Sequence, residues 1–111
     1  MLRICSNKIK AFDVDDTLIS QDPLKELTVQ VNCFGQMQMV AVNNELVQKI
    51  KEEYSKGTTI VVWSQQGDEW ADAVVRSIGL ENHVHYTMTK ISEAYDDLPI
   101  KEWMKLSKVK F

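Results

Sequence analysis

Apolar positions along the chain form two kinds of pattern: short continuous runs, and stretches in which they recur every three or four residues. The continuous runs predict four strands, over residues 9–14, 58–63, 83–89 and 94–96. The spaced positions predict three helices, from Asn43 or Asn44 to about Lys56, from a cap at Asp68 to about Gly79, and from about Pro99 onward. Strands that alternate with helices build a parallel sheet covered by helices. The pattern therefore predicts an α/β fold with a three-layer, Rossmann-like parallel sheet.

Residues 27–42 follow a different rule, because their apolar positions alternate with polar ones. Leu27, Val29, Val31 and Cys33 form one alternating set, and Met37, Met39 and Ala41 form the other. Alternation of period two is typical of half-buried strands, so we expect a hairpin that turns at residues 34–36. The simplest interpretation turns the two methionines toward Val29 and Val31 on the core side of this hairpin; a dimer or substrate-lid surface is the alternative.

The last predicted helix carries four large apolar side chains that we expect to face inward. They are Ile100, Trp103, Met104 and Leu106.

Length and composition favour one soluble domain over residues 1–111. The chain is 44% hydrophobic and 26% charged, and its net charge of −3 predicts no strong attraction to nucleic acid or membranes. Charges interrupt the first ten residues, so no signal peptide is expected, and no apolar run approaches the ~20 residues of a membrane helix. Cys5 and Cys33 lie far apart and form no metal or disulfide motif. We expect reduced thiols and a cytoplasmic location.

Acidic and polar residues follow the predicted strands at the point where each one ends. The first strand leads into "AFDVDDTLIS", which crowds three aspartates into four positions. The residues that close the four strands are Asp13, Asp15, Asp16 and Thr17; Ser64; Lys90; and Asp96 and Asp97. Ligands of such sheets bind beyond the carboxyl ends of the strands, so these side chains are expected to meet there.

Their chemistry fits a divalent cation and a phosphate group. Aspartates from two strand ends supply the oxygen ligands that Mg²⁺ prefers, and the cation would relieve their mutual repulsion. Lys90 and Ser64 could hold the phosphate oxygens. Asp13 and Asp15 could have different catalytic roles. One would attack phosphorus, and the other would protonate the leaving oxygen and then activate water.

At these residues the chain resembles the haloacid dehalogenase-like (HAD) superfamily of phosphohydrolases. "FDVDDTL" matches its first motif, Asp-x-Asp-x-Thr-Leu after an apolar strand. Ser64 in "VVWSQQG" matches the second motif, Lys90 the third, and the acidic pair in "AYDDLP" the fourth. The four motifs occur in order over essentially the whole chain.

The resemblance implies a Mg²⁺-dependent phosphomonoester hydrolase. Asp13 would be the nucleophile that forms an aspartyl-phosphate, and Asp15 the general acid/base. The implied metal ligands are Asp13, Asp15 through its backbone carbonyl, and Asp96, with Asp97 either as a further ligand or as a residue that supports the ligands. The implied phosphate-binding residues are Thr17, Ser64 and Lys90. There is no room for a cap domain, so the hairpin would be the flap of a capless enzyme.

The chain departs from the family pattern at two points. Position 16 is Asp where the family usually has Gly, and the interval from Lys90 to Asp96 is short, which leaves Lys101 as a weaker candidate for the phosphate lysine. The residues specify neither the phosphorylated substrate, with a nucleic-acid end among the open classes, nor whether the protein is a monomer or a homodimer.

The residues also bear on two other classes of protein and on one other kind of site. A signalling receiver domain needs an aspartate at the end of a middle strand, where this chain has Ser64. A catalytically silent binding protein that uses the hairpin as its contact surface remains as the alternative. His83 and His85 lack a third ligand at metal-binding spacing, which favours strand-end histidines over a metal site.

Overall fold

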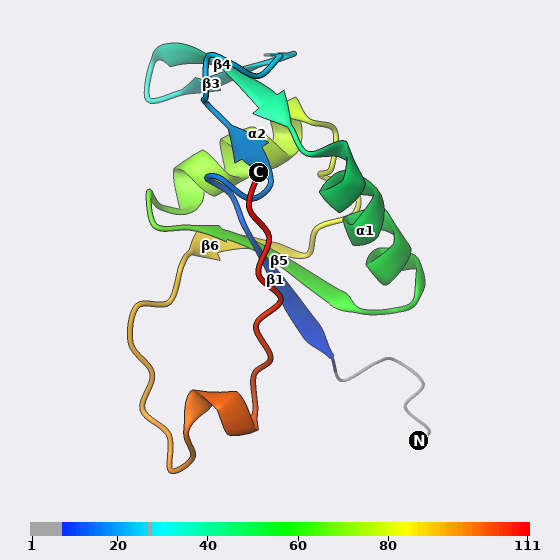
Figure 1. Ribbon diagram of the computed structural model, residues 1–111, viewed down its shortest axis with the longest axis vertical. Helices are drawn as coiled ribbons and strands as arrows, with labels where there is room; N and C mark the ends of the chain where they lie inside the picture. The colour runs from blue at the N-terminus through cyan, green and yellow to red at the C-terminus, as the bar shows by residue number, and fades with distance from the viewer. Residues whose placement is uncertain (1–7, 27) are drawn as a thin grey trace.

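A computed structural model describes residues 8–26 and 28–111, and its centre is a small parallel sheet (Figure 1). Strand β1 (Ile9–Asp13) pairs with β5 (Thr59–Ser64), which pairs with β6 (Tyr86–Thr89), all parallel. The continuously apolar β5 is the middle strand, as its sequence predicts, and Ile60 and Val62 are fully buried. The register pairs Asp13 with Trp63, so the carboxyl ends of β1 and β5 lie together.

Helix α1 (Asn44–Ser55) begins and ends as its sequence predicts. The side chain of Asn43 accepts a hydrogen bond from the backbone N–H of Leu46 and caps the helix. Leu46, Val47 and Ile50 turn into the core. Gly57 follows the helix with a φ of 85°, a conformation that glycine adopts at little cost.

Helix α2 (Asp68–Ser77) lies between the parallel sheet and the hairpin, in contact with β5, β6 and strand β3 (Val29–Cys33) (Figure 1). Trp70, Ala71, Val74 and Val75 are its buried residues. The predicted cap at Asp68 is wrong by one position, because Gly67 is the cap residue and Asp68 begins the helix. An acidic residue in the first turn still interacts favourably with the helix dipole.

The predicted hairpin is present in a second, antiparallel sheet. It consists of β3 and β4 (Gln36–Val42), and β4 also pairs with a short strand, β2 (Ile19–Ser20), that the sequence did not predict. Leu27, the predicted start of the hairpin, lies outside the described residues.

The predicted orientation of the hairpin side chains is wrong, because the turn is one residue shorter than expected. Cys33 pairs with Gln36, so Phe34 and Gly35 alone make the turn, with φ values of 55° and 71°. Two positive φ values are typical of a tight type I′ hairpin turn. A shift of one residue moves every side chain to the other face. Met37 and Met39 are therefore 64% and 45% exposed, while Val31 and Val40 are buried.

The C-terminal part of the chain differs most from the prediction. No strand forms at 94–96, and the predicted last helix is only a 3₁₀ turn, η1 (Ile100–Glu102). Its four apolar side chains are exposed rather than inward-facing, and Leu106 is 85% exposed. Pro99 occupies the cap position without a side-chain cap, and Trp103 leaves the helical region with a φ of −131°. A helix so short is unstable without packing, and its apolar side chains are too exposed to supply much of it.

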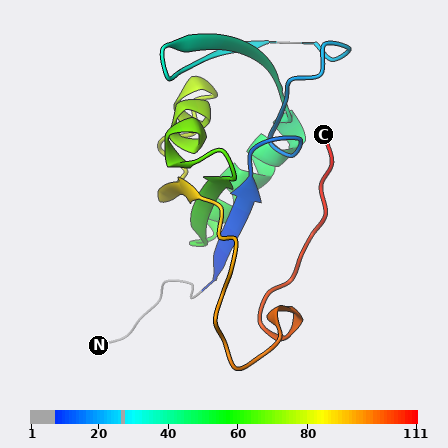
Figure 2. The same cartoon turned by 90° about the vertical axis from the view of Figure 1, so that its left-hand side faces the viewer.

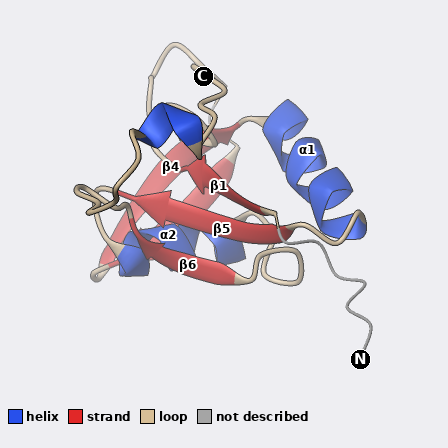
Figure 3. Cartoon of the chain, turned by 90° about the horizontal axis from the view of Figure 1, so that it is seen from below, coloured by secondary structure: helices blue, strands red, loops and turns tan. Residues whose placement is uncertain are grey.

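After η1 the chain runs back, without regular structure, to the loop that follows β1 (Figure 2). The backbone N–H of Phe111 donates a hydrogen bond to the carbonyl of Asp16 over 2.8 Å. Figure 3 shows the C-terminal end of this segment on the side of β1 that faces away from β5. Within the described ranges no helix is long and apolar enough to cross a membrane.

Candidate active site

The loop after β1 winds tightly around one backbone carbonyl. The oxygen of Val14 lies 3.4, 3.0 and 3.1 Å from the backbone nitrogens of Thr17, Leu18 and Ile19. Val14, Leu18 and Ile19 are fully buried and anchor the loop in the core. The polar residues between them are thereby held at the end of β1. Asp16 has a φ of 60°, a left-handed conformation that explains why glycine suits this position and which Asp tolerates better than most residues.

Asp13, the last residue of β1, has a cationic and a hydroxyl neighbour. The Nζ atom of Lys90, which directly follows β6, lies 3.8 Å from Asp13 Oδ1. The hydroxyl of Thr17 lies 3.4 Å from Asp13 Oδ2 and can donate to it. About a third of each side chain of the Asp13–Lys90 pair is exposed, at 30% and 35%. The carboxylate is therefore both accessible and compensated in charge.

Asp15 is fixed by two donors from separate elements. Ser64 at the end of β5 donates from its hydroxyl to Asp15 Oδ2 over 3.2 Å, and the indole nitrogen of Trp70 donates to Asp15 Oδ1, also over 3.2 Å. The Ser64 hydroxyl in turn accepts the backbone N–H of Gln66 over 2.9 Å. Because Ser64 and Trp70 are buried, the carboxylate of Asp15 is held in one orientation.

Asn43 joins this loop to helix α1. Besides capping the helix, its side-chain nitrogen donates to the carbonyl of Thr17 over 3.0 Å, and its backbone N–H donates to the carbonyl of Leu18 over 2.8 Å. The helix start and the polar loop are therefore held by one residue.

The acidic pair Asp96 and Asp97 is not brought to this cluster. Both lie in the exposed segment between β6 and η1, where the Asp96 carboxylate accepts the backbone N–H of Leu98 over 2.9 Å. That hydrogen bond and, next, the side chain of Asp97 hold the pKa of Asp96 below its ordinary value. The prediction that this pair converges with Asp13 needs a strand over 94–96, and that strand is absent.

A family model described as NLI interacting factor-like phosphatase matches residues 9–109. The chain belongs to this family. The NLI interacting factor-like phosphatases are a HAD-like phosphatase family, so the resemblance seen in the sequence is confirmed, together with the class of enzyme, a phosphatase. No curated protein and no solved structure matches the chain.

Members of HAD-like families such as the NLI interacting factor-like phosphatases generally use Mg²⁺. Asp13 and the backbone carbonyl of Asp15 offer suitable oxygen donors, but the structure does not gather a full ligand set. Over residues 8–26 and 28–111, no three His, Cys, Asp or Glu side chains are close enough to share a metal ion. The oxygen donors are therefore of the kind that Mg²⁺ prefers, but the structure does not place enough of them close together to bind it.

Sequence reasoning missed two residues of the site in this phosphatase. The sequence patterns gave Trp70 no place in the site, and they marked Asn43 only as a possible start of a helix. A tryptophan on the buried face of a helix needs a partner for its N–H, and this requirement is the signal that could have pointed to Asp15. Nothing in the sequence indicates the second hydrogen bond of Asn43.

Proposed function

We propose that this phosphatase hydrolyses a phosphomonoester in two steps through an aspartyl-phosphate on Asp13. The observation that carries the proposal is the cluster at the end of β1, where Asp13 is partly exposed and faces Lys90 while Asp15 is fixed by Ser64 and Trp70. The two aspartates thus have different surroundings, which suits two different roles.

In the first step a carboxylate oxygen of Asp13 attacks phosphorus, and the bond from phosphorus to the leaving oxygen breaks. Asp15 gives a proton to that oxygen and then accepts one from the water that hydrolyses the intermediate. Lys90 offsets negative charge on the transferred group, and the hydroxyl of Thr17 is a further donor to it. Ser64, predicted to bind phosphate directly, donates to Asp15 in the structure and acts here by positioning it.

Mg²⁺ would be held by Asp13, the Asp15 carbonyl, Asp96 and Asp97, and when bound it would offset charge on the phosphoryl oxygens. This ligand set requires the segment of residues 90–99 to come to β1, which is an edge strand of the described sheet. An unpaired strand edge can accept such a segment.

The finer features of the architecture belong to the same proposal. The described residues form a single HAD-like domain without a cap, in which the β3–β4 hairpin acts as the flap. The protein acts in the cytoplasm on a phosphorylated small molecule or macromolecule.

A second candidate function is a catalytically silent binding protein of the same fold. It is favoured by the separation of Asp96 and Asp97 from the cluster, and by the exposed Phe34, Met37 and Met39 on the hairpin.

Hydrolysis of p-nitrophenyl phosphate with and without Mg²⁺ separates the two. The proposed phosphatase is active with Mg²⁺ and loses at least about 10³-fold in kcat in Asp13→Asn while the variant still binds Mg²⁺. Asp22→Asn is the matched control, because Asp22 is exposed and an amide oxygen can still accept its hydrogen bond from Leu24. Activity retained in Asp13→Asn would remove the nucleophile assignment, and a wild type inactive under both conditions would favour the silent protein.

A further inference from the structure

The end of the described chain lies on the loop that carries the proposed nucleophile. Residues 109–111 contact this loop at two places (Figure 2). The N–H of Phe111 donates to the Asp16 carbonyl over 2.8 Å, and the Val109 carbonyl lies 3.4 Å from the hydroxyl of Thr17. These contacts join positions 92 residues or more apart in sequence.

The contact to Thr17 affects the proposed chemistry directly. A threonine hydroxyl carries one hydrogen, so it can donate strongly to one acceptor at a time. In the structure it has two candidate acceptors at 3.4 Å, the carboxylate of Asp13 and the carbonyl of Val109. A phosphoryl oxygen that needs this hydrogen must therefore displace one of them.

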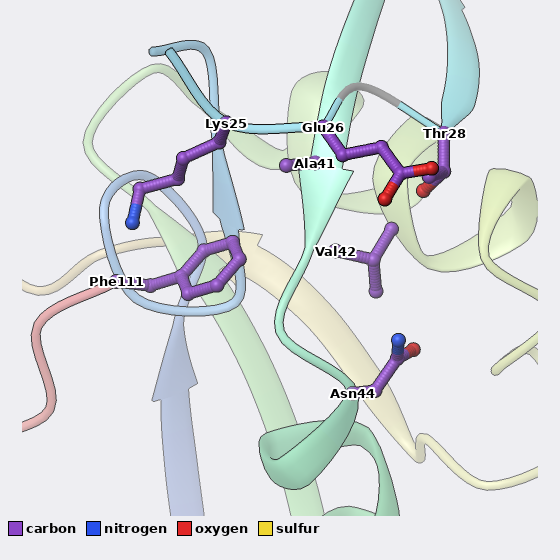
Figure 4. Close-up of a pocket in the computed structure, with 7 residues that line it drawn as sticks. All are labelled: Lys25, Glu26, Thr28, Ala41, Val42, Asn44 and Phe111. Atoms are coloured by element: carbon purple, nitrogen blue, oxygen red, sulfur yellow. The ribbon is translucent and has the colours of Figure 1, made fainter.

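A third contact involves the ring of Phe111. The ammonium group of Lys25 lies 4.5 Å from the ring centroid, a favourable cation–π distance. The two side chains line a hollow of about 310 Å³ together with Val42 and Asn44. Figure 4 shows Lys25 and Phe111 beside one another, with Asn44 farther away.

The segment that leads to residue 109 contributes little to hold it in place. It has no regular structure after η1, and Leu106 is 85% exposed. Release of residues 109–111 would therefore cost only the few contacts described above.

We infer that residues 109–111 are an inhibitory strap, which contacts the Thr17 hydroxyl and competes with a phosphorylated substrate for it. The inference rests on the proposed function of the same site. If only the released form binds substrate, the apparent affinity falls by the fraction of molecules in which the strap is open.

The test compares two proline variants of the full chain. Phe111→Pro removes both the N–H that bonds Asp16 and the ring that meets Lys25. Leu106→Pro is the control, because it places the same residue in the same segment at an exposed position. With p-nitrophenyl phosphate we expect KM to fall about fivefold or more in Phe111→Pro, at unchanged kcat, and to stay at the wild-type value in Leu106→Pro. The ¹⁵N heteronuclear NOE of Val109 should fall only in Phe111→Pro.

The outcomes distinguish this inference from the proposed function. If the wild type and Phe111→Pro both hydrolyse the substrate with the same KM, the inference of an inhibitory strap is wrong, while the proposed phosphatase activity is supported. If no form hydrolyses it, the proposed function fails, and the strap is judged by titrating inorganic phosphate against the Thr17 amide resonance. Tighter binding in Phe111→Pro supports the strap, and equal or absent binding overturns it.

Discussion

The indole nitrogen of Trp70 donates to a carboxylate oxygen of Asp15 over 3.2 Å, from a helix to the loop after β1. Trp70 is 2% exposed, so its ring is fixed in the core, and the bond restricts the rotation of the half-buried Asp15 side chain. Together with Ser64, it gives the proposed acid/base a fixed direction. The core of the protein thus takes part in positioning the site.

Trp70→Phe keeps an aromatic ring in the core but removes the N–H. We expect kcat for p-nitrophenyl phosphate to fall about tenfold while KM stays near its wild-type value, because Asp15 loses one of its two donors but substrate binding does not use it. Trp103→Phe, at an exposed position, is the control and should change neither constant. A kcat equal to that of the wild type would show that Ser64 alone positions Asp15.

Asn43 has two functions that substitutions can separate. Asn43→Ser keeps an oxygen that can cap α1 but cannot reach the Thr17 carbonyl as the amide does, whereas Asn43→Ala loses both bonds. We expect Asn43→Ala to lower the free energy of unfolding by about 1–2 kcal/mol, and Asn43→Ser by less. Both should lower kcat alike, because the loop loses the same support. Urea denaturation and steady-state kinetics measure the two effects, and wild-type kcat in Asn43→Ser would contradict the link to the loop.

Glu53 makes the fold sensitive to acid. Its buried carboxylate lies 3.0, 3.4 and 3.8 Å from the Nζ atoms of Lys10, Lys49 and Lys56, and it also accepts a hydrogen bond from Thr58. These contacts, that from Lys10 above all, outweigh the burial and lower the pKa of Glu53 from 4.5 to about 2. Because the folded pKa lies below the unfolded one, the stabilisation is complete above pH 4.5 and is lost as the pH falls toward 2.

Glu53→Gln should therefore cost about 2 kcal/mol at pH 7, a value reduced by the partial exposure of the three lysines. The difference from the wild type should shrink steadily between pH 4.5 and about 2. Thermal unfolding across this range measures it, with the exposed Glu52→Gln as the control. An equal loss of stability at pH 7 and at pH 2.5 would show that the ion pairs are not its source.

The register of the hairpin predicts which of its side chains contribute to stability. Val31 is fully buried on the face toward α2, and Met39 is 45% exposed on the other face. We expect Val31→Ala to cost about 1–2.5 kcal/mol and Met39→Ala less than about 0.5 kcal/mol. Chemical denaturation of the two variants tests the register, and the opposite order of effects would restore the arrangement predicted from the sequence.

The pairing of the two hairpin strands could not be predicted from the sequence pattern alone. Alternation alone fixes which residues share a face within one strand, but the turn decides how the two strands are matched. The positive φ of Phe34, a residue that does not favour it, is visible only in the structure. Strands β1 and β5 and the two long helices followed from local patterns, because each buries a continuous apolar run or stripe.

The candidate site was predictable in the part that strand ends determine. Asp13, Ser64 and Lys90 end or directly follow parallel strands, so topology alone brings them together. The placement of Asp96 depends instead on whether a short polar segment pairs with β1, and sequence patterns do not determine so weak an interaction. The path of residues 104–111 depends on a few tertiary contacts that no local pattern encodes.

Transfer of a phosphoryl group to Asp13 is tested most directly by trapping the phosphorylated intermediate. Asp15→Asn should still accept the group from p-nitrophenyl phosphate, since this leaving group departs without a proton, but it should fail to activate water. After an acid quench, peptide mass spectrometry should find the phosphoryl group on Asp13. The proposed mechanism would be contradicted if p-nitrophenol were released in a burst while Asp13 stayed unmodified, whether the phosphoryl group was then found on another residue or on none.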